Sequence, residues 1–132
     1  MKGRIMNGSV VLKSLAVLAI LFGVTAIVDG LPIVLGIKNP DHLVLTWLIY
    51  YNLTMAVVSI FVGFGFWLRH AHAINVAGLV AVGHTIVWLL ILTIFSDAVA
   101  MKSVIGMTVR SVIWISIFVL LSKKKESWFS PA

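Results

Sequence analysis

The sequence predicts an all-α integral membrane protein, folded as an antiparallel up-down-up-down bundle of four transmembrane helices. Of its 132 residues, 61% are hydrophobic and 11% are charged, whereas a soluble domain is about 45–50% apolar and about 25% charged. The apolar residues form long blocks without the period-two alternation of barrel strands. Short polar links separate the blocks and favour antiparallel neighbours. We therefore expect a single membrane domain over residues 1–132.

The first apolar block has two interpretations. Residues 14–28 would rise only about 22 Å as a helix, less than the roughly 30 Å hydrocarbon core. The basic start, the short apolar run and the small residues at 24–26 also resemble a cleavable signal peptide. If the helix instead continues to Ile37, it is long enough to span. Pro32 then removes one backbone hydrogen bond, and we expect a kink near Asp29 and Gly30.

The other three blocks are long enough to span as they stand. Turn-forming residues at 36–41 precede the second block, and a very short polar link at 69–72 follows it. Residues 96–102 form the next turn, in which Ser96 or Asp97 is a candidate N-cap. The expected elements are helices at about 9–37, 43–68, 73–95 and 102–122, between basic cytoplasmic tails at 1–8 and 123–132.

Lysine and arginine next to the helix ends predict the orientation. Four spans place both termini and the link at 69–72 on one side of the membrane. Seven basic residues lie on that side and two, Lys38 and Lys102, on the other. The seven are Lys2, Arg4, Lys13, Arg69, Lys123, Lys124 and Lys125. Because basic residues favour the cytoplasmic side, we expect a multi-pass protein of the inner or plasma membrane with both termini in the cytoplasm.

Composition and motifs exclude several kinds of chemistry. The net charge of +6 lies at the ends of the apolar blocks and not on one face, so we expect no nucleic-acid partner. The chain has no cysteine, which excludes disulfides and thiolate ligands. We expect no haem, because His84 is the single histidine within the apolar blocks, and no metal or other cofactor. No phosphate loop, hydrolase triad, HExxH or paired-carboxylate motif is present, so nothing favours an enzyme.

A layer of polar residues is the best candidate for a site. Counted from the outer helix ends, one polar residue of each helix lies at a similar depth. The depths are roughly 12 Å for Asp29, 13–14 Å for Asn52, 16 Å for His84 and 12 Å for Arg110. An ionisable residue such as Arg110 is costly at this depth and marks a functional site by default. We expect Asp29 and Arg110 to pair, directly or through a water, a polar residue or a bound anion.

Aromatic and small residues accompany this layer. Ser103 and Gly106 share the helix face of Arg110, and Trp114 offers its ring to the guanidinium. The predicted ligand-binding residues are Asp29, Tyr51, Asn52, His84, Trp88, Arg110 and Trp114. Several of them also have a purely structural interpretation. Arg110 could reach the headgroups, Asp29 could lie at the surface, Asn52 and His84 could join helices, and Tyr51 could be an interfacial anchor.

Three functions fit these observations. The first is binding, or helping to transport, a small or lipid-like ligand, anionic ligands included, in the polar pocket. The second is an accessory subunit of a larger membrane complex or a homo-oligomer, which predicts small residues left without a partner in the monomer. Gly63, Gly65, Gly78 and Gly83 are the candidates for such a stripe. The third is a membrane-embedded enzyme with His84 as base, which requires a cavity large enough for a substrate.

Overall fold

The computed structural model describes residues 8–39, 45–97 and 101–129. Every secondary-structure element in these ranges is a helix. The elements are α1 (Gly8–Val34), α2 (Thr46–Trp67), α3 (His72–Leu92), α4 (Met101–Lys123) and α5 (Lys125–Trp128). The first four are each long and apolar enough to cross a membrane. The predicted all-α fold with four long apolar helices is therefore confirmed, and this is the pattern of a multi-pass membrane protein.

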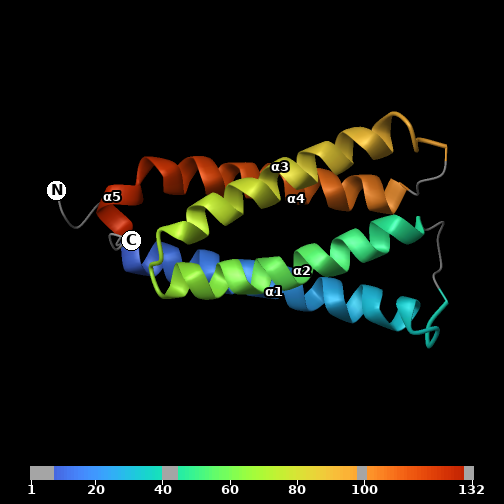
Figure 1. The fold of residues 1–132 in the computed structure, drawn as a ribbon, viewed down its shortest axis with the longest axis horizontal. Helices are drawn as coiled ribbons and strands as arrows, with labels where there is room; N and C mark the ends of the chain where they lie inside the picture. Colours follow the sequence, from blue (N-terminus) through green and yellow to red (C-terminus); the bar gives the residue numbers. More distant parts are fainter. Residues whose placement is uncertain (1–7, 40–44, 98–100, 130–132) are drawn as a thin grey trace.

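The helices pack as two pairs (Figure 1). α1 lies along α2, α3 lies along α4, and the main contact between the two pairs runs from α2 to α3. The α2–α3 turn and α5 lie at one end of the structure, where Arg69, Lys123, Lys124 and Lys125 are found; we call this the basic end. The end of α1 and the start of α2 lie at the opposite end, together with the end of α3 and the start of α4.

α1 continues through Asp29, Gly30 and Pro32, where the sequence left the end of the helix open. It is one helix of 27 residues with Pro32 inside it, and it ends at Val34, three residues before the expected end. Gly36 has a φ of 77°, which glycine adopts at little cost, and this residue stops the helix. At 27 residues the helix is long enough to cross a membrane. The kink near Asp29 and Gly30 stays a prediction.

The other helix ends differ from expectation by a few residues. α3 ends at Leu92 and not at Phe95, because residues 93–97 form turns in which the Phe95 amide donates to the Leu90 carbonyl at 3.0 Å. α2 begins at Thr46, and the expected start at 43–44 lies outside the described residues. Such differences are typical where a helix frays into a turn.

The turn between α2 and α3 is a Schellman motif. The His70 amide donates to the Gly65 carbonyl at 2.8 Å, and the Arg69 amide donates to the Phe66 carbonyl at 3.0 Å. Arg69 takes the left-handed conformation with a φ of 59°, which costs a non-glycine residue about 1 kcal/mol. Its Nε donates to the Trp128 carbonyl at 2.8 Å, so a contact with the C-terminal segment holds this side chain in place.

The C-terminal segment is ordered against the bundle and is not a free polar tail. After α4 the chain forms α5, and Phe129 is buried with its ring edge-on to Phe66, the centroids 6.4 Å apart. Lys124 lies over the Trp128 ring, 5.9 Å from its centroid. The segment therefore closes the basic end of the bundle. The expected tail at 1–8 lies outside the described residues except for Gly8.

Small residues set the close contact between α1 and α2. A Cβ added to Gly23 would lie 2.5 Å from the Ala56 carbonyl oxygen, and one added to Gly63 would lie 2.8 Å from the Ala16 carbonyl oxygen. Ala16 and Ala56, which these two glycines approach, are buried, and so is Ala19 on α1. Since helices in a membrane associate through packing more than through the hydrophobic effect, such backbone proximity is an important source of stability.

Candidate functional site

A small polar cavity lies where all four long helices meet. Its volume is about 20 Å³, which is room for about one water molecule. Its lining residues are Phe22, Ala26, Asn52, Met55, Ala56, Ser59, His84, Arg110 and Trp114. Four of the predicted ligand-binding residues, Asn52, His84, Arg110 and Trp114, therefore surround one cavity.

Arg110 is held by an amide and not by a carboxylate. It is partly buried on α4, and its Nη1 donates to Asn52 Oδ1 on α2 at 3.2 Å. This is its single hydrogen bond among the described residues. A guanidinium has five N–H donors, so most of its hydrogen-bonding capacity is unused. Among the described residues, the hydrogen-bond partner of this positive charge is therefore a neutral amide.

Asp29 does not form the expected direct ion pair with Arg110. It is exposed on α1 and forms no hydrogen bond or ion pair within the described part of the chain. Asp29 lies three residues after Ala26, which lines the cavity, and so is about one helical turn further along α1. At that position its carboxylate attracts the Arg110 guanidinium electrostatically but does not form a hydrogen bond with it. Pairing through a water or a bound anion stays a prediction.

His84 is tied to Tyr51, the neighbour of Asn52. The imidazole is buried with 3% of its surface exposed, and its Nδ1 lies 2.8 Å from the Tyr51 hydroxyl oxygen in a hydrogen bond. The two rings meet edge to face, with centroids 5.7 Å apart. Tyr51 therefore belongs to the polar layer. Two hydrogen bonds join α2 to its neighbours: Tyr51–His84 joins it to α3, and Asn52–Arg110 joins it to α4.

The two predicted tryptophans take different positions. Trp114 is 1% exposed and forms part of the cavity wall. Trp88 lies outside the cavity lining, and its Nε1 donates to Thr108 Oγ1 at 2.6 Å, which links α3 to α4. Thr108 was not among the predicted residues. The signal that could have found it is the indole N–H itself, which needs an acceptor when it is buried between helices.

The glycines proposed as a docking stripe are already used inside the bundle. A Cβ on Gly63 would meet Ile20 and Ala16, one on Gly65 would meet Ala73, one on Gly78 would meet Phe118, and one on Gly83 would meet Tyr51, all within 3.0 Å. Gly106 differs, because a Cβ there would meet nothing within 4 Å. It lies four residues before Arg110, so the helix face next to the guanidinium is open in that direction.

The structure has the four long apolar helices typical of a multi-pass membrane protein, with a small polar cavity between them. No three histidine, aspartate or glutamate residues gather into a metal-binding group in the described ranges. No protein-family model, curated protein or solved structure matches the chain. The site chemistry alone therefore directs the functional proposal.

Proposed function

We propose that this protein binds the anionic group of a small or lipid-like ligand at Arg110, and that it serves the binding or transport of that ligand in the membrane. The observation that supports this proposal most directly is the state of Arg110. It lies between four helices with one amide partner, and no carboxylate of the described ranges lies within ion-pair distance of it. A cation at the middle of a spanning helix costs about 2.5–3.5 kcal/mol on insertion scales. A bound anion would offset that cost.

The chemistry around the guanidinium suits a carboxylate, phosphate or sulfate group. A guanidinium binds such anions through paired N–H donors, and Arg110 keeps donors free for this. Trp114 and Phe22 supply apolar walls for the rest of a ligand, while Ser59 is the nearby hydroxyl of the lining. His84 is oriented by Tyr51 and adds a polar ring to the same wall.

Ligand entry requires the helix pairs to move, because the cavity holds about one water. α1 packs closely on α2 and α3 packs closely on α4, whereas contact between the pairs runs mainly through α2 and α3. We propose that each pair moves as a unit about the Schellman turn at Arg69 and His70. Opening away from the basic end would expose Arg110 on the side of Gly106, where the helix face is free.

The alternatives have less support. An accessory subunit was expected to leave a glycine stripe without a partner, but Gly63, Gly65, Gly78 and Gly83 all pack within the chain. An enzyme with His84 as base would need the same movement of the helix pairs to admit a substrate to the cavity of about 20 Å³, and the sequence carries no catalytic motif that favours it. In the accessory role, the anion beside Arg110 would be a carboxylate of another subunit.

The proposal includes an antiparallel up-down-up-down bundle in the inner or plasma membrane, with both termini in the cytoplasm. Seven basic residues against two support this orientation. We expect a phosphatase reporter fused after Ala132 to be inactive and a green fluorescent reporter there to be bright. Reporters fused after Lys38 should show the opposite. Phosphatase activity at Ala132 would overturn the orientation.

Anion binding can be followed on the arginine side chains. The chain has three arginines, Arg4, Arg69 and Arg110, so ¹⁵N-arginine labelling gives few Nε–H signals, and Arg110→Lys assigns the one of interest. In detergent micelles we expect benzoate and decanoate to shift the Arg110 signal in a saturable way. Benzyl alcohol and decanol, the neutral counterparts, should not shift it, because they offer no charge to the guanidinium.

Arg69 provides the internal control for that titration. Its Nε is already bound to the Trp128 carbonyl, so its signal should stay in place while that of Arg110 moves. Equal shifts of both arginines, equal effects of acid and alcohol, or no saturable shift at Arg110 would each contradict the proposed site.

A further inference from the structure

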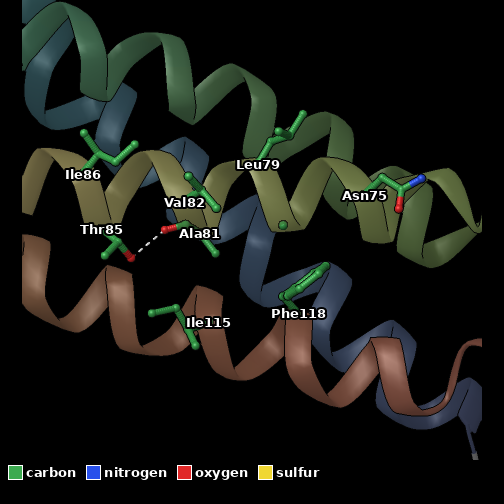
Figure 2. Close-up of a pocket in the computed structure, with 9 residues that line it drawn as sticks. Asn75, Leu79, Ala81, Val82, Thr85, Ile86, Ile115 and Phe118 are labelled. Carbon is green, nitrogen blue, oxygen red and sulfur yellow. Dashed lines mark hydrogen bonds between the residues drawn. The ribbon is translucent and has the colours of Figure 1, made fainter.

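A long apolar groove lies between α3 and α4 (Figure 2), and it shares no lining residue with the polar cavity. Its volume is about 630 Å³, within the usual range of ligand sites of about 300–1,000 Å³. Leu79, Val82 and Ile86 of α3 form an exposed wall, with 70%, 56% and 53% of their surfaces accessible. Ile115 and Phe118 of α4 form the opposite side.

The groove is open because small residues lie along it. A Cβ on Gly78 would be 2.7 Å from the Phe118 ring, so a larger residue there would fill the space in front of that ring. Thr85 adds no free polar donor, because its hydroxyl donates to the Ala81 carbonyl at 2.8 Å. The groove is therefore apolar along its length, except for Asn75 at one end.

The length of the groove matches one leaflet of a bilayer. From Asn75 to Ile86 the helix rises about 16 Å, and half of the hydrocarbon core is about 15 Å. Asn75 lies three residues after the start of α3, so the groove begins near the basic end of the bundle, and Ile86 places its other end about two thirds of the way along α3. An acyl chain of the lipid leaflet at that end would fit along it.

The charge at the basic end fits an anionic headgroup. Lys123 and Lys125 are exposed and form no ion pair in the part of the chain that the structure describes. Lys124 lies over Trp128, and Arg69 is bound to the Trp128 carbonyl. Glu126 is the single carboxylate of the described residues at this end. Basic clusters beside spanning helices attract anionic lipids by about 1 kcal/mol per residue.

We propose that the α3–α4 groove binds an acyl chain of an anionic phospholipid, and that the lysines at the basic end bind its headgroup. Asn75 lies between the two parts, where it can donate to the ester or phosphate oxygens. This lipid site does not depend on the anion site at Arg110, which lies between the helix pairs.

Native mass spectrometry of the full chain in detergent micelles tests the lipid site. The probes are phosphatidylglycerol and phosphatidylcholine with identical acyl chains. We expect phosphatidylglycerol to bind about tenfold more tightly, as about 1.4 kcal/mol from one or two basic residues would give. Equal affinity for the two lipids would overturn the headgroup assignment.

Two pairs of variants separate the groove from the charge. Val82→Trp fills the groove and should weaken binding of both lipids about tenfold, whereas Val17→Trp, on the exposed face of α1, should leave binding unchanged. Ile115→Trp fills the groove from α4 and makes the same test if Val82→Trp fails to fold. Equal losses for the α1 variant and the groove variants would overturn the proposal.

The second pair concerns the headgroup. Replacing Lys123, Lys124 and Lys125 by glutamine should remove the preference for phosphatidylglycerol while phosphatidylcholine still binds. The matched control replaces Lys38 and Lys102, which are exposed at the opposite end, and should keep the preference. A preference that survives the triple change, or is lost in the control, would contradict binding of the headgroup at the basic end.

Discussion

Gly23→Ala should destabilise the protein by about 2 kcal/mol or more, a large effect for one methyl group. The new Cβ would lie 2.5 Å from the Ala56 carbonyl oxygen, a backbone atom that cannot turn aside. The α1–α2 pair must therefore separate, and overpacking of this kind costs about 1–3 kcal/mol. In a membrane, close contact between small residues is a principal source of helix association. Reversible unfolding in mixed micelles with increasing dodecyl sulfate measures the change in free energy.

Gly106→Ala is the matched control, with the same methyl group on another of the four long helices. A Cβ at Gly106 meets nothing within 4 Å, and alanine stabilises a helix by about 0.5–1 kcal/mol relative to glycine. We therefore expect Gly106→Ala to leave stability unchanged or to raise it slightly. Equal losses for Gly23→Ala and Gly106→Ala would show that α1 and α2 do not approach as closely as the structure indicates.

The helices could be predicted because the apolar blocks are long. A block of about 20 residues has few alternatives to a spanning helix, and α1 to α4 begin and end within a few residues of expectation. The C-terminal segment could not be predicted in this way. Phe129 is buried through its contact with Phe66, which lies 63 residues earlier in the chain, and no local pattern encodes that contact. Charge and polarity alone made residues after Lys123 look like a solvated tail.

The sequence predicts how deep along the helices the polar side chains lie, but not which of them is the hydrogen-bond partner of Arg110. A fixed rise per residue determines how far along a helix each side chain lies, and this brought Asn52, His84 and Arg110 to one level, as the structure has them. Whether Arg110 binds a carboxylate or an amide depends on how each helix is rotated about its axis. It also depends on shifts of about one helical turn between neighbouring helices along their axes. Asp29 is exposed beyond Ala26, while Asn52 faces the cavity. Residue counting does not resolve that difference.

Arg110 should couple energetically to Asn52 much more strongly than to Asp29. Asn52→Leu removes the one hydrogen-bond acceptor that the described part of the chain offers Arg110, and hydrogen bonds to charged groups contribute about 1.5–3 kcal/mol. In the Arg110→Met background no guanidinium is left to satisfy, so Asn52→Leu should cost much less. The coupling energy of this double-mutant cycle is expected to be about 1–3 kcal/mol. Unfolding of the four proteins in mixed micelles measures it.

The Asp29 cycle is the comparison that separates the two possible partners. Asp29 is exposed and forms no ion pair within the described chain, so Asp29→Leu and Arg110→Met should be additive to within about 0.5 kcal/mol. Strong coupling to Asp29 with none to Asn52 would mean that the two charges pair through a water or an anion in the membrane, because removing one member of a buried pair costs about 3–5 kcal/mol.

Adding benzoate to the same unfolding measurement tests whether Arg110 binds an anion. A ligand at about 100 times its Kd stabilises its protein by about 2.7 kcal/mol, and this gain should vanish in Arg110→Met while Asp29→Leu retains it.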